Sequence, residues 1–115
     1  MTFGSGVLLG EVEQLILLAV LRLGEMAYAV PIRALIERET GVRVSRGTIY
    51  VTLERLERKG YVTSWFSDPR AVRGGKARRC FRLKPPGIAA VKASKHAVDR
   101  LARGTVADKP IERER

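Results

Sequence analysis

The stretch SRGTIYVTLERLERKGYV, residues 45–62, constrains the fold most because it has the signals of a helix with two marked ends. Ser45 is a favoured N-cap residue, and Gly60 is a favoured residue just past the end of a helix. Apolar side chains between them recur on one narrow arc and are expected to face a core: Ile49, Leu53 and Leu56.

The opposite arc of this helix carries a mixture that is unusual for a face turned to water. A glycine and a β-branched residue lie beside charged residues, with a tyrosine and a threonine at the edges. The members are Gly47, Thr48, Tyr50, Val51, Glu54, Arg55 and Arg58. The elements that flank the helix indicate what this face contacts.

Two further helices are predicted before it. The first covers Glu11–Leu23, ends at Gly24 and is apolar around nearly its whole circumference. The second lies in AVPIRALIERETG, where Pro31 suits the first turn and Gly41 ends the helix. A chain of 115 residues has little material to cover the first helix on all sides, so we expect a second subunit to cover part of it.

Two runs rich in β-branched and aromatic residues follow, over Tyr61–Ser67 and Arg78–Leu83. Pro69 and the Gly74–Gly75 pair lie between them, so the unit is predicted to be a β-hairpin with a long tip. Residues 43–84 hold 12 basic and 3 acidic side chains, and thus 9 of the chain's 10 net positive charges. Such a local basic surface suits a polyanion: nucleic acid first, an anionic membrane surface second.

A final helix is expected from Pro85 to about Arg103, with apolar positions that approximate a coiled-coil seam. The order of elements predicts a mainly α fold with a small β-hairpin, namely a winged helix-turn-helix with a C-terminal dimerisation helix. We expect residues 1–9 to be a flexible N-terminus and residues 10–84 to be the DNA-binding domain. Residues 85–103 would form the dimerisation helix, and residues 104–115 a disordered tail.

In a winged helix-turn-helix the third helix enters the major groove of DNA, and the hairpin, or wing, reaches the adjacent backbone or minor groove. Short or flat residues allow close approach to base edges, while hydroxyl and guanidinium groups can contact phosphates or bases. The predicted recognition-helix contacts are Ser45, Arg46, Gly47, Thr48, Tyr50 and Val51. The alternative is an ordinary surface helix with Tyr50 packed on the second helix.

The wing is predicted to follow the phosphate backbone through its basic residues, which are Arg70, Arg73, Lys76, Arg78 and Arg79. A basic hairpin that only protects a sheet edge is the alternative. Later in the recognition helix, Glu54, Arg55, Glu57 and Arg58 are expected to form a solvated surface paired within itself. The predicted dimer interface uses apolar positions of the first and last helices: Leu15, Leu18, Ile88, Val91, Val98 and Leu101.

One cysteine and one histidine are too few for a disulfide frame or a zinc site. We expect Cys80 to be a small buried residue and His96 a solvent or interface side chain, with redox and pH sensing as alternatives. Trp65 and Phe66 alternate, so one is expected to face the core and the other to be partly exposed. No catalytic constellation or phosphate loop is visible, so we predict no enzyme and no cofactor.

The longest uninterrupted apolar run is far shorter than the ~20 residues that span a bilayer. We therefore expect no membrane anchor. The single cysteine, which leaves no disulfide frame, favours a cytoplasmic protein.

The chain resembles the PadR family of bacterial transcriptional regulators. GTIYVTLERLERKGYV is similar to the recognition-helix signature of the family, and GGKARRCFRLKPPG is similar to its wing and the entry to its last helix. The resemblance implies a homodimer in which the last helix of one subunit packs on the first helix of the other. It also implies the short subclass, with a single C-terminal helix. Lys84-Pro85-Pro86 departs from the usual Thr N-cap, and Cys80-Phe81 from the usual aromatic pair.

The function expected from these features is a homodimeric, sequence-specific regulator of double-stranded DNA, acting as a repressor that an unidentified small molecule relieves. The alternative is a winged-helix protein-interaction module with only nonspecific affinity for nucleic acid. An enzyme ranks behind both.

Overall fold

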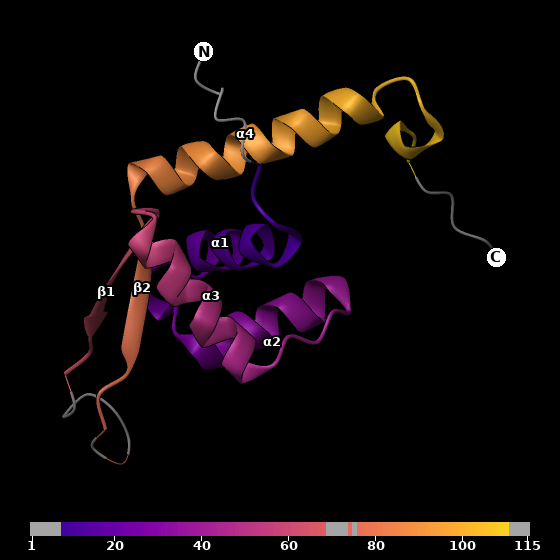
Figure 1. Cartoon of the computed structure of the whole chain (residues 1–115). Helices are drawn as coiled ribbons and strands as arrows, with labels where there is room; N and C mark the ends of the chain where they lie inside the picture. The colour runs from indigo at the N-terminus through magenta and orange to yellow at the C-terminus, as the bar shows by residue number, and fades with distance from the viewer. Residues whose placement is uncertain (1–7, 69–73, 75, 111–115) are drawn as a thin grey trace.

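The computed structural model describes residues 8–68, 74 and 76–110. The elements in chain order are α1 (Glu11–Leu23), η2 (Gly24–Met26), α2 (Ala29–Thr40), α3 (Arg46–Arg58), β1 (Val62–Phe66), β2 (Arg79–Leu83), α4 (Pro85–Ala102) and η4 (Val106–Asp108). Helices α1, α2 and α3 form a cluster, the hairpin lies beside it, and α4 lies along the upper edge above α1 (Figure 1). The predicted fold, mainly α with a small β-hairpin, is confirmed.

The ends of the helices follow from local capping preferences that can be read in the sequence. Ser45 is the N-cap of α3, and its Oγ accepts a hydrogen bond from the Thr48 N–H at 3.1 Å. Gly41 ends α2 in the left-handed conformation, with φ of 77°, and its N–H donates to the Glu37 carbonyl at 2.8 Å. These two ends fix the short loop that turns the chain from α2 into α3.

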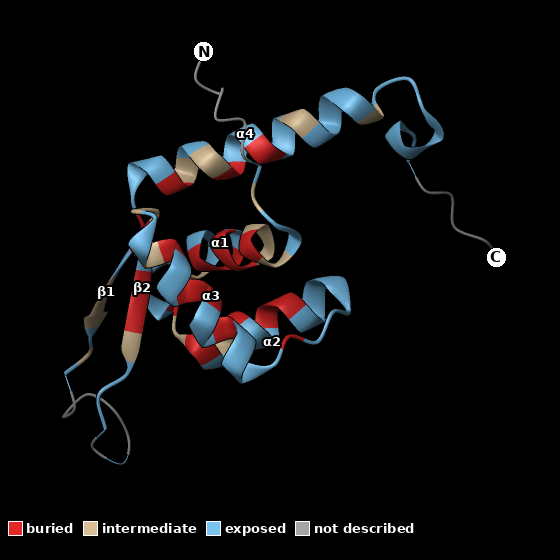
Figure 2. Ribbon diagram, viewed as in Figure 1, coloured by how far each residue is buried: buried red, intermediate tan, exposed pale blue. Residues whose placement is uncertain are grey.

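The core lies where the three helices meet the hairpin, and buried residues line the facing sides of these elements (Figure 2). The largest fully buried side chains are Phe81, Ile16, Leu17, Ile32, Ile49, Leu53, Leu56, Val20 and Val62. Helix α1 is covered on most sides by its own chain, including α4. Of the apolar side chains of α1, Leu18 and Leu21 are the ones left exposed, so the surface open to a second subunit is smaller than the sequence suggests.

The hairpin is antiparallel, with a register that runs from Val62 opposite Leu83 to Phe66 opposite Arg79. The Phe81 N–H donates to the Ala27 carbonyl at 2.8 Å, which docks β2 on the segment between α1 and α2. Phe66 is 69% exposed and Trp65 is half-buried outside the core, so the prediction that one of them faces the core is wrong. Phe81 takes that place because its face of β2 packs on α1.

The prediction for Cys80 is confirmed, because the side chain is buried on the second strand. Burial raises the pKa of its thiol, which the nearby Arg78 offsets only in part. A thiol held protonated in this way is a poor nucleophile.

Helix α4 begins with two prolines, which suit a first turn because its N–H groups have no partner within the helix. The Lys84 N–H donates to the Tyr61 carbonyl at 2.9 Å, and Gly87 packs directly on that carbonyl, where a Cβ would overlap it. This contact sets the start angle that the sequence alone does not predict.

The first half of α4 packs on its own chain. Val91 is buried in the core, and the Oγ of buried Ser94 accepts a hydrogen bond from the Leu9 N–H at 3.0 Å. Val91 therefore has little surface for a partner, contrary to its predicted place in a dimer interface, because α4 folds back over α1 of the same chain. Beyond α4, the segment expected to be disordered includes the short 3-10 helix η4.

Candidate nucleic-acid interface

The first two turns of α3 are open to solvent on the face that the sequence predicts. Ile49 is fully buried, whereas the candidate contacts Ser45, Arg46, Gly47, Thr48, Tyr50 and Val51 are all exposed. Tyr50 is 40% exposed, so packing on α2 does not account for all of it. Apart from the local backbone of α3, no atom lies within 4 Å of a Cβ built on Gly47. The packing of the chain therefore does not require a glycine at this position.

The start of α3 and the hairpin lie on the same side of the molecule. In Figure 1, α3 begins at the lower edge and rises toward α4, and both strands extend downward from the end of the molecule where α4 begins. Helix α4 lies along the opposite edge.

The predicted wing contacts divide into three groups. Arg70 and Arg73 lie outside the described residues. Lys76 and Arg78 are exposed, and the Arg78 guanidinium lies 4.5 Å from the centre of the Tyr28 ring, which gives it a defined position. Arg79 is half-buried and has other partners.

Arg79 links the wing to the later turns of α3. One of its terminal nitrogens donates to Glu57 at 2.8 Å and the other lies 3.7 Å from Glu54, while Ser64 donates to Glu57 at 2.9 Å. The sequence predicts that Glu54 and Glu57 pair within the helix, but the structure pairs both with the wing. The hairpin brings a cation over them, which spacing along one helix cannot reveal. Arg79 is therefore paired within the chain, and among the predicted wing residues that the structure describes, Lys76 and Arg78 are the exposed ones.

Glu13 holds the far end of α3 to α1. This carboxylate is buried, accepts a hydrogen bond from the Gly10 N–H at 3.0 Å, and receives the Lys59 ammonium at 2.9 Å, with Arg55 at 3.8 Å. Burial raises the pKa of Glu13, but the bond to Lys59, the bond to Gly10 and the charge of Arg55 together hold it below its ordinary value. Sequence spacing could indicate the contact with Gly10, three residues earlier. The partners on α3 could not be predicted, because they depend on how the helices pack.

A second feature that sequence reasoning misses is a cleft between α2 and α3. It has a volume of about 350 Å³ and is lined by Ala29, Val30, Arg33, Ala34, Glu37, Arg43 and Arg46. The Arg33 Nε donates to the Val44 carbonyl at 2.9 Å, and Arg43 pairs with Glu37 at 3.2 Å. The cleft adjoins the first turn of α3 because Arg46 belongs to both.

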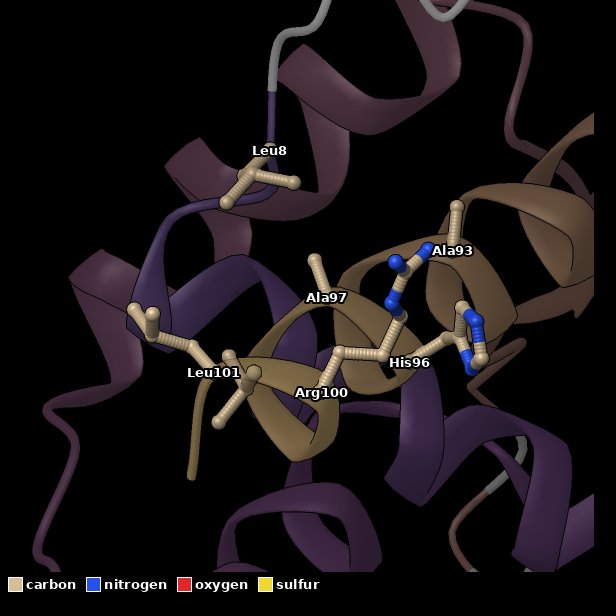
Figure 3. Close-up of a pocket in the computed structure, with 7 residues that line it drawn as sticks. Leu8, Ala93, His96, Ala97, Arg100 and Leu101 are labelled. Carbon is tan, nitrogen blue, oxygen red and sulfur yellow. The ribbon is translucent and has the colours of Figure 1, made fainter. Parts of the chain in front are cut away.

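The far half of α4 borders an open hollow of about 610 Å³, together with Leu8 of the N-terminal segment (Figure 3). Its lining comprises Leu8, Ala93, His96, Ala97, Val98, Arg100 and Leu101. His96 is exposed beside it, in line with the expected solvent or interface position. This hollow lies on the side of the molecule away from the start of α3.

The described residues contain no cluster of His, Cys, Asp and Glu arranged to hold a metal ion. Within the same residues, no helix is long and apolar enough to cross a bilayer.

Residues 17–93 match the transcriptional regulator PadR-like family, which is more than half of the chain. The chain belongs to this family. The transcriptional regulator Rv3488 of Mycobacterium tuberculosis is 46% identical over 63 residues, which is 55% of this chain and 55% of that protein. The chain thus matches about half the length of that relative. Both the PadR-like family and this relative are transcriptional regulators and not enzymes, in agreement with the sequence prediction.

Solved structures of similar fold support the winged helix-turn-helix. A transcriptional regulator from Clostridium thermocellum aligns with a TM-score of 0.67 at 23% identity, over 80% of this chain and 86% of that one. A PadR family regulator from Clostridium difficile aligns with a TM-score of 0.66 at 24% identity, over 81% and 95%. The winged helix-turn-helix is a DNA-binding fold, and PadR-like regulators use it for that purpose.

Proposed function

We propose that this PadR-like chain is a homodimeric, sequence-specific DNA-binding repressor whose hold on DNA is relieved by a small molecule. The observation that carries the proposal is the exposed start of α3. Six residues suited to phosphate and base contacts are open there, including a glycine that the fold does not require. The two recognition helices of a dimer would occupy half-sites about one helical turn apart.

Dimerisation is supported by the apolar surface that the single chain leaves uncovered. Leu101 is 85% exposed and Val98 is 56% exposed on the far half of α4, beside the hollow that Leu8 borders. Leu18 on α1 is also exposed, while Ile88 and Leu15 are partly buried at the edge of the core. The partner's first and last helices would cover this surface, at the end of α4 farthest from the wing.

Repression and relief by a small molecule are expectations from the family. A dimer interface that includes a hollow offers a place where a bound molecule could change the spacing of the two α3 helices. A regulator of this kind acts in the cytoplasm, where bacterial DNA lies.

The test is a shift assay at near-physiological salt, with the full chain, the promoter region of its own gene and a random duplex of the same length. The proposal expects clear preference for the promoter, and equal affinity for the two duplexes would refute specificity. Replacing Arg46 and Tyr50 with Ala should abolish the preference while sedimentation still shows a dimer. A protein-interaction module predicts instead that this variant keeps its protein partner and that no duplex is preferred.

Dimerisation is tested by Leu101→Glu, with Lys92→Glu, an exposed change on the same helix, as the control. A charge in an apolar interface should shift the sedimentation coefficient to that of a monomer, and the control should remain dimeric. A monomeric wild-type chain at the concentrations used for DNA binding would refute the homodimer.

A further inference from the structure

We infer that the cleft between α2 and α3 binds one phosphate group of the DNA backbone, with Arg33 and Arg43 as contacts beside Arg46. This inference rests on the proposed DNA binding and adds a site to it. Three arginines and one glutamate are among the residues that line the cleft, and together they carry a net charge of +2. A phosphodiester carries one negative charge and offers oxygens that planar guanidinium groups can bind in pairs.

Arg33 is held ready for this contact. Its Nε donates to the Val44 carbonyl at 2.9 Å, which fixes the guanidinium plane and leaves its two terminal nitrogens for a ligand. Among the residues that the structure describes, neither Arg33 nor Arg46 forms an ion pair with a carboxylate. A guanidinium group that is already fixed loses less conformational entropy when a ligand binds, so the entropic cost of binding is lower.

The other walls of the cleft allow the backbone of a nucleic acid to approach. Ala29, Val30 and Ala34 are small, and a volume of about 350 Å³ leaves room for a phosphate with part of its sugar. The one carboxylate, Glu37, pairs with Arg43 at 3.2 Å, and the Arg43 side chain is 80% exposed. Glu37 thus competes with a phosphate for Arg43 and weakens the site.

The position of the cleft selects DNA over a free anion. Arg46 is the first residue of α3 and lines the cleft, so a phosphate there lies next to the surface that contacts bases. One such phosphate in each half-site would fix the depth and register of α3 in the groove, as backbone contacts do in other DNA complexes.

The experiment uses the full chain and the duplex that it prefers, with single phosphates replaced one at a time by uncharged methylphosphonates. Wild-type protein should lose affinity at a small set of phosphates in each half-site. Arg33→Gln should bind the native duplex with an affinity about tenfold lower for each subunit that makes the contact. For this variant, a methylphosphonate at one phosphate per half-site should no longer lower the affinity. Arg38→Gln, a change on the same helix outside the cleft, should retain the wild-type pattern.

A second variant separates the site from any loss of folding. Glu37→Gln removes the competing carboxylate, so it should bind DNA more tightly than wild type, by a few fold, and a damaged fold cannot produce that gain. The inference is overturned if Arg33→Gln binds the duplex as tightly as wild type, or if it stays sensitive to all the phosphates to which wild type is sensitive. It is also overturned if Glu37→Gln binds DNA no more tightly than wild type. Equal competition by inorganic phosphate and by duplex would also overturn it, since the site would then bind a free anion. If wild-type protein binds no duplex, the proposed function fails as well.

Discussion

The two ends of α3 differ in what surrounds them. At the first end, Arg46 and Tyr50 are exposed, and a Cβ added to Gly47 would contact no neighbouring element. At the last end, Lys59 and Arg55 meet the buried Glu13 carboxylate, and Glu57 holds Arg79 of the wing. The same helix is thus open where the proposed contacts with DNA lie and fixed where the fold needs it.

This difference explains how one helix can contact a duplex without losing its position. Ion pairs and hydrogen bonds at the last end orient the helix against α1 and the hairpin. At the first end, Ile49 is buried and Ser45 caps the helix, while the opposite face stays free for a partner. Changes at the last end should lower the free energy of unfolding, and changes at the first end should lower DNA affinity. The following predictions separate the two quantities, beginning with the largest effect.

Gly87→Ala should have the largest effect on stability. The added Cβ would overlap the carbonyl of Tyr61, which lies between α3 and β1 and accepts the hydrogen bond from Lys84. We expect a loss of about 3 kcal/mol in the free energy of unfolding, because backbone atoms must move. Urea unfolding measures it, with Ala89→Gly on the exposed side of α4 as a control that should cost about 1 kcal/mol or less. Equal losses for the two variants would contradict the close packing.

Glu13→Gln should cost about 1–2 kcal/mol, because the amide keeps a hydrogen-bond acceptor but loses the charge that Lys59 and Arg55 meet. Both cations are more than a third exposed, so solvent screening keeps the loss at this level. Thermal unfolding measures it. Glu39→Gln, which removes a carboxylate from an exposed pair with Arg22, should change stability little. If both variants lost the same amount of stability, the buried Glu13 carboxylate would contribute no more to stability than an exposed one.

The contribution of Glu13 to the free energy of unfolding should also depend on pH. The folded pKa is lower than the ordinary value of 4.5, so the unfolded chain takes up the proton first as pH falls. The difference in stability between wild type and Glu13→Gln should therefore be constant well above pH 4.5 and shrink below it. Unfolding curves across this range measure the difference. If this difference in stability instead grew as the pH fell, the pKa of Glu13 would have to be raised in the folded protein.

Ser45 allows a smaller test at the open end. Ser45→Ala removes the acceptor for the Thr48 N–H and should cost about 1 kcal/mol of stability. Ser45→Asp keeps a capping oxygen, so its stability should match wild type, while its negative charge should repel DNA phosphates and weaken binding. Chemical denaturation and anisotropy titrations on the same samples measure the two effects. Unchanged DNA affinity for Ser45→Asp would place this end of α3 away from the duplex.

The sequence predicts the elements well where local chemistry decides them. Ser45 and Gly41 mark helix ends by backbone and capping preferences, and the apolar arc of α3 marks its buried side. It predicts less where distant segments meet. The burial of Val91 by α1, the pairing of Arg79 with Glu57 and the hydrogen bond from Arg33 to Val44 all depend on packing between elements. Packing between elements also explains why α1 leaves less apolar surface for a second subunit than its sequence suggests, since other elements of the same chain cover most of it.

One pair of variants tests the central claim directly: Arg46→Ala with Tyr50→Ala at the open end, and Glu13→Gln at the fixed end. Anisotropy titrations with the preferred duplex, at a temperature where both variants are folded, give the affinities. We expect the first variant to lose about a hundredfold or more, at roughly 1–3 kcal/mol for each contact, with stability close to wild type. The second should keep its affinity within about threefold although it is less stable. The reverse pattern, or equal losses of affinity in both, would contradict the assignment of the open end of α3 as the DNA-contacting surface.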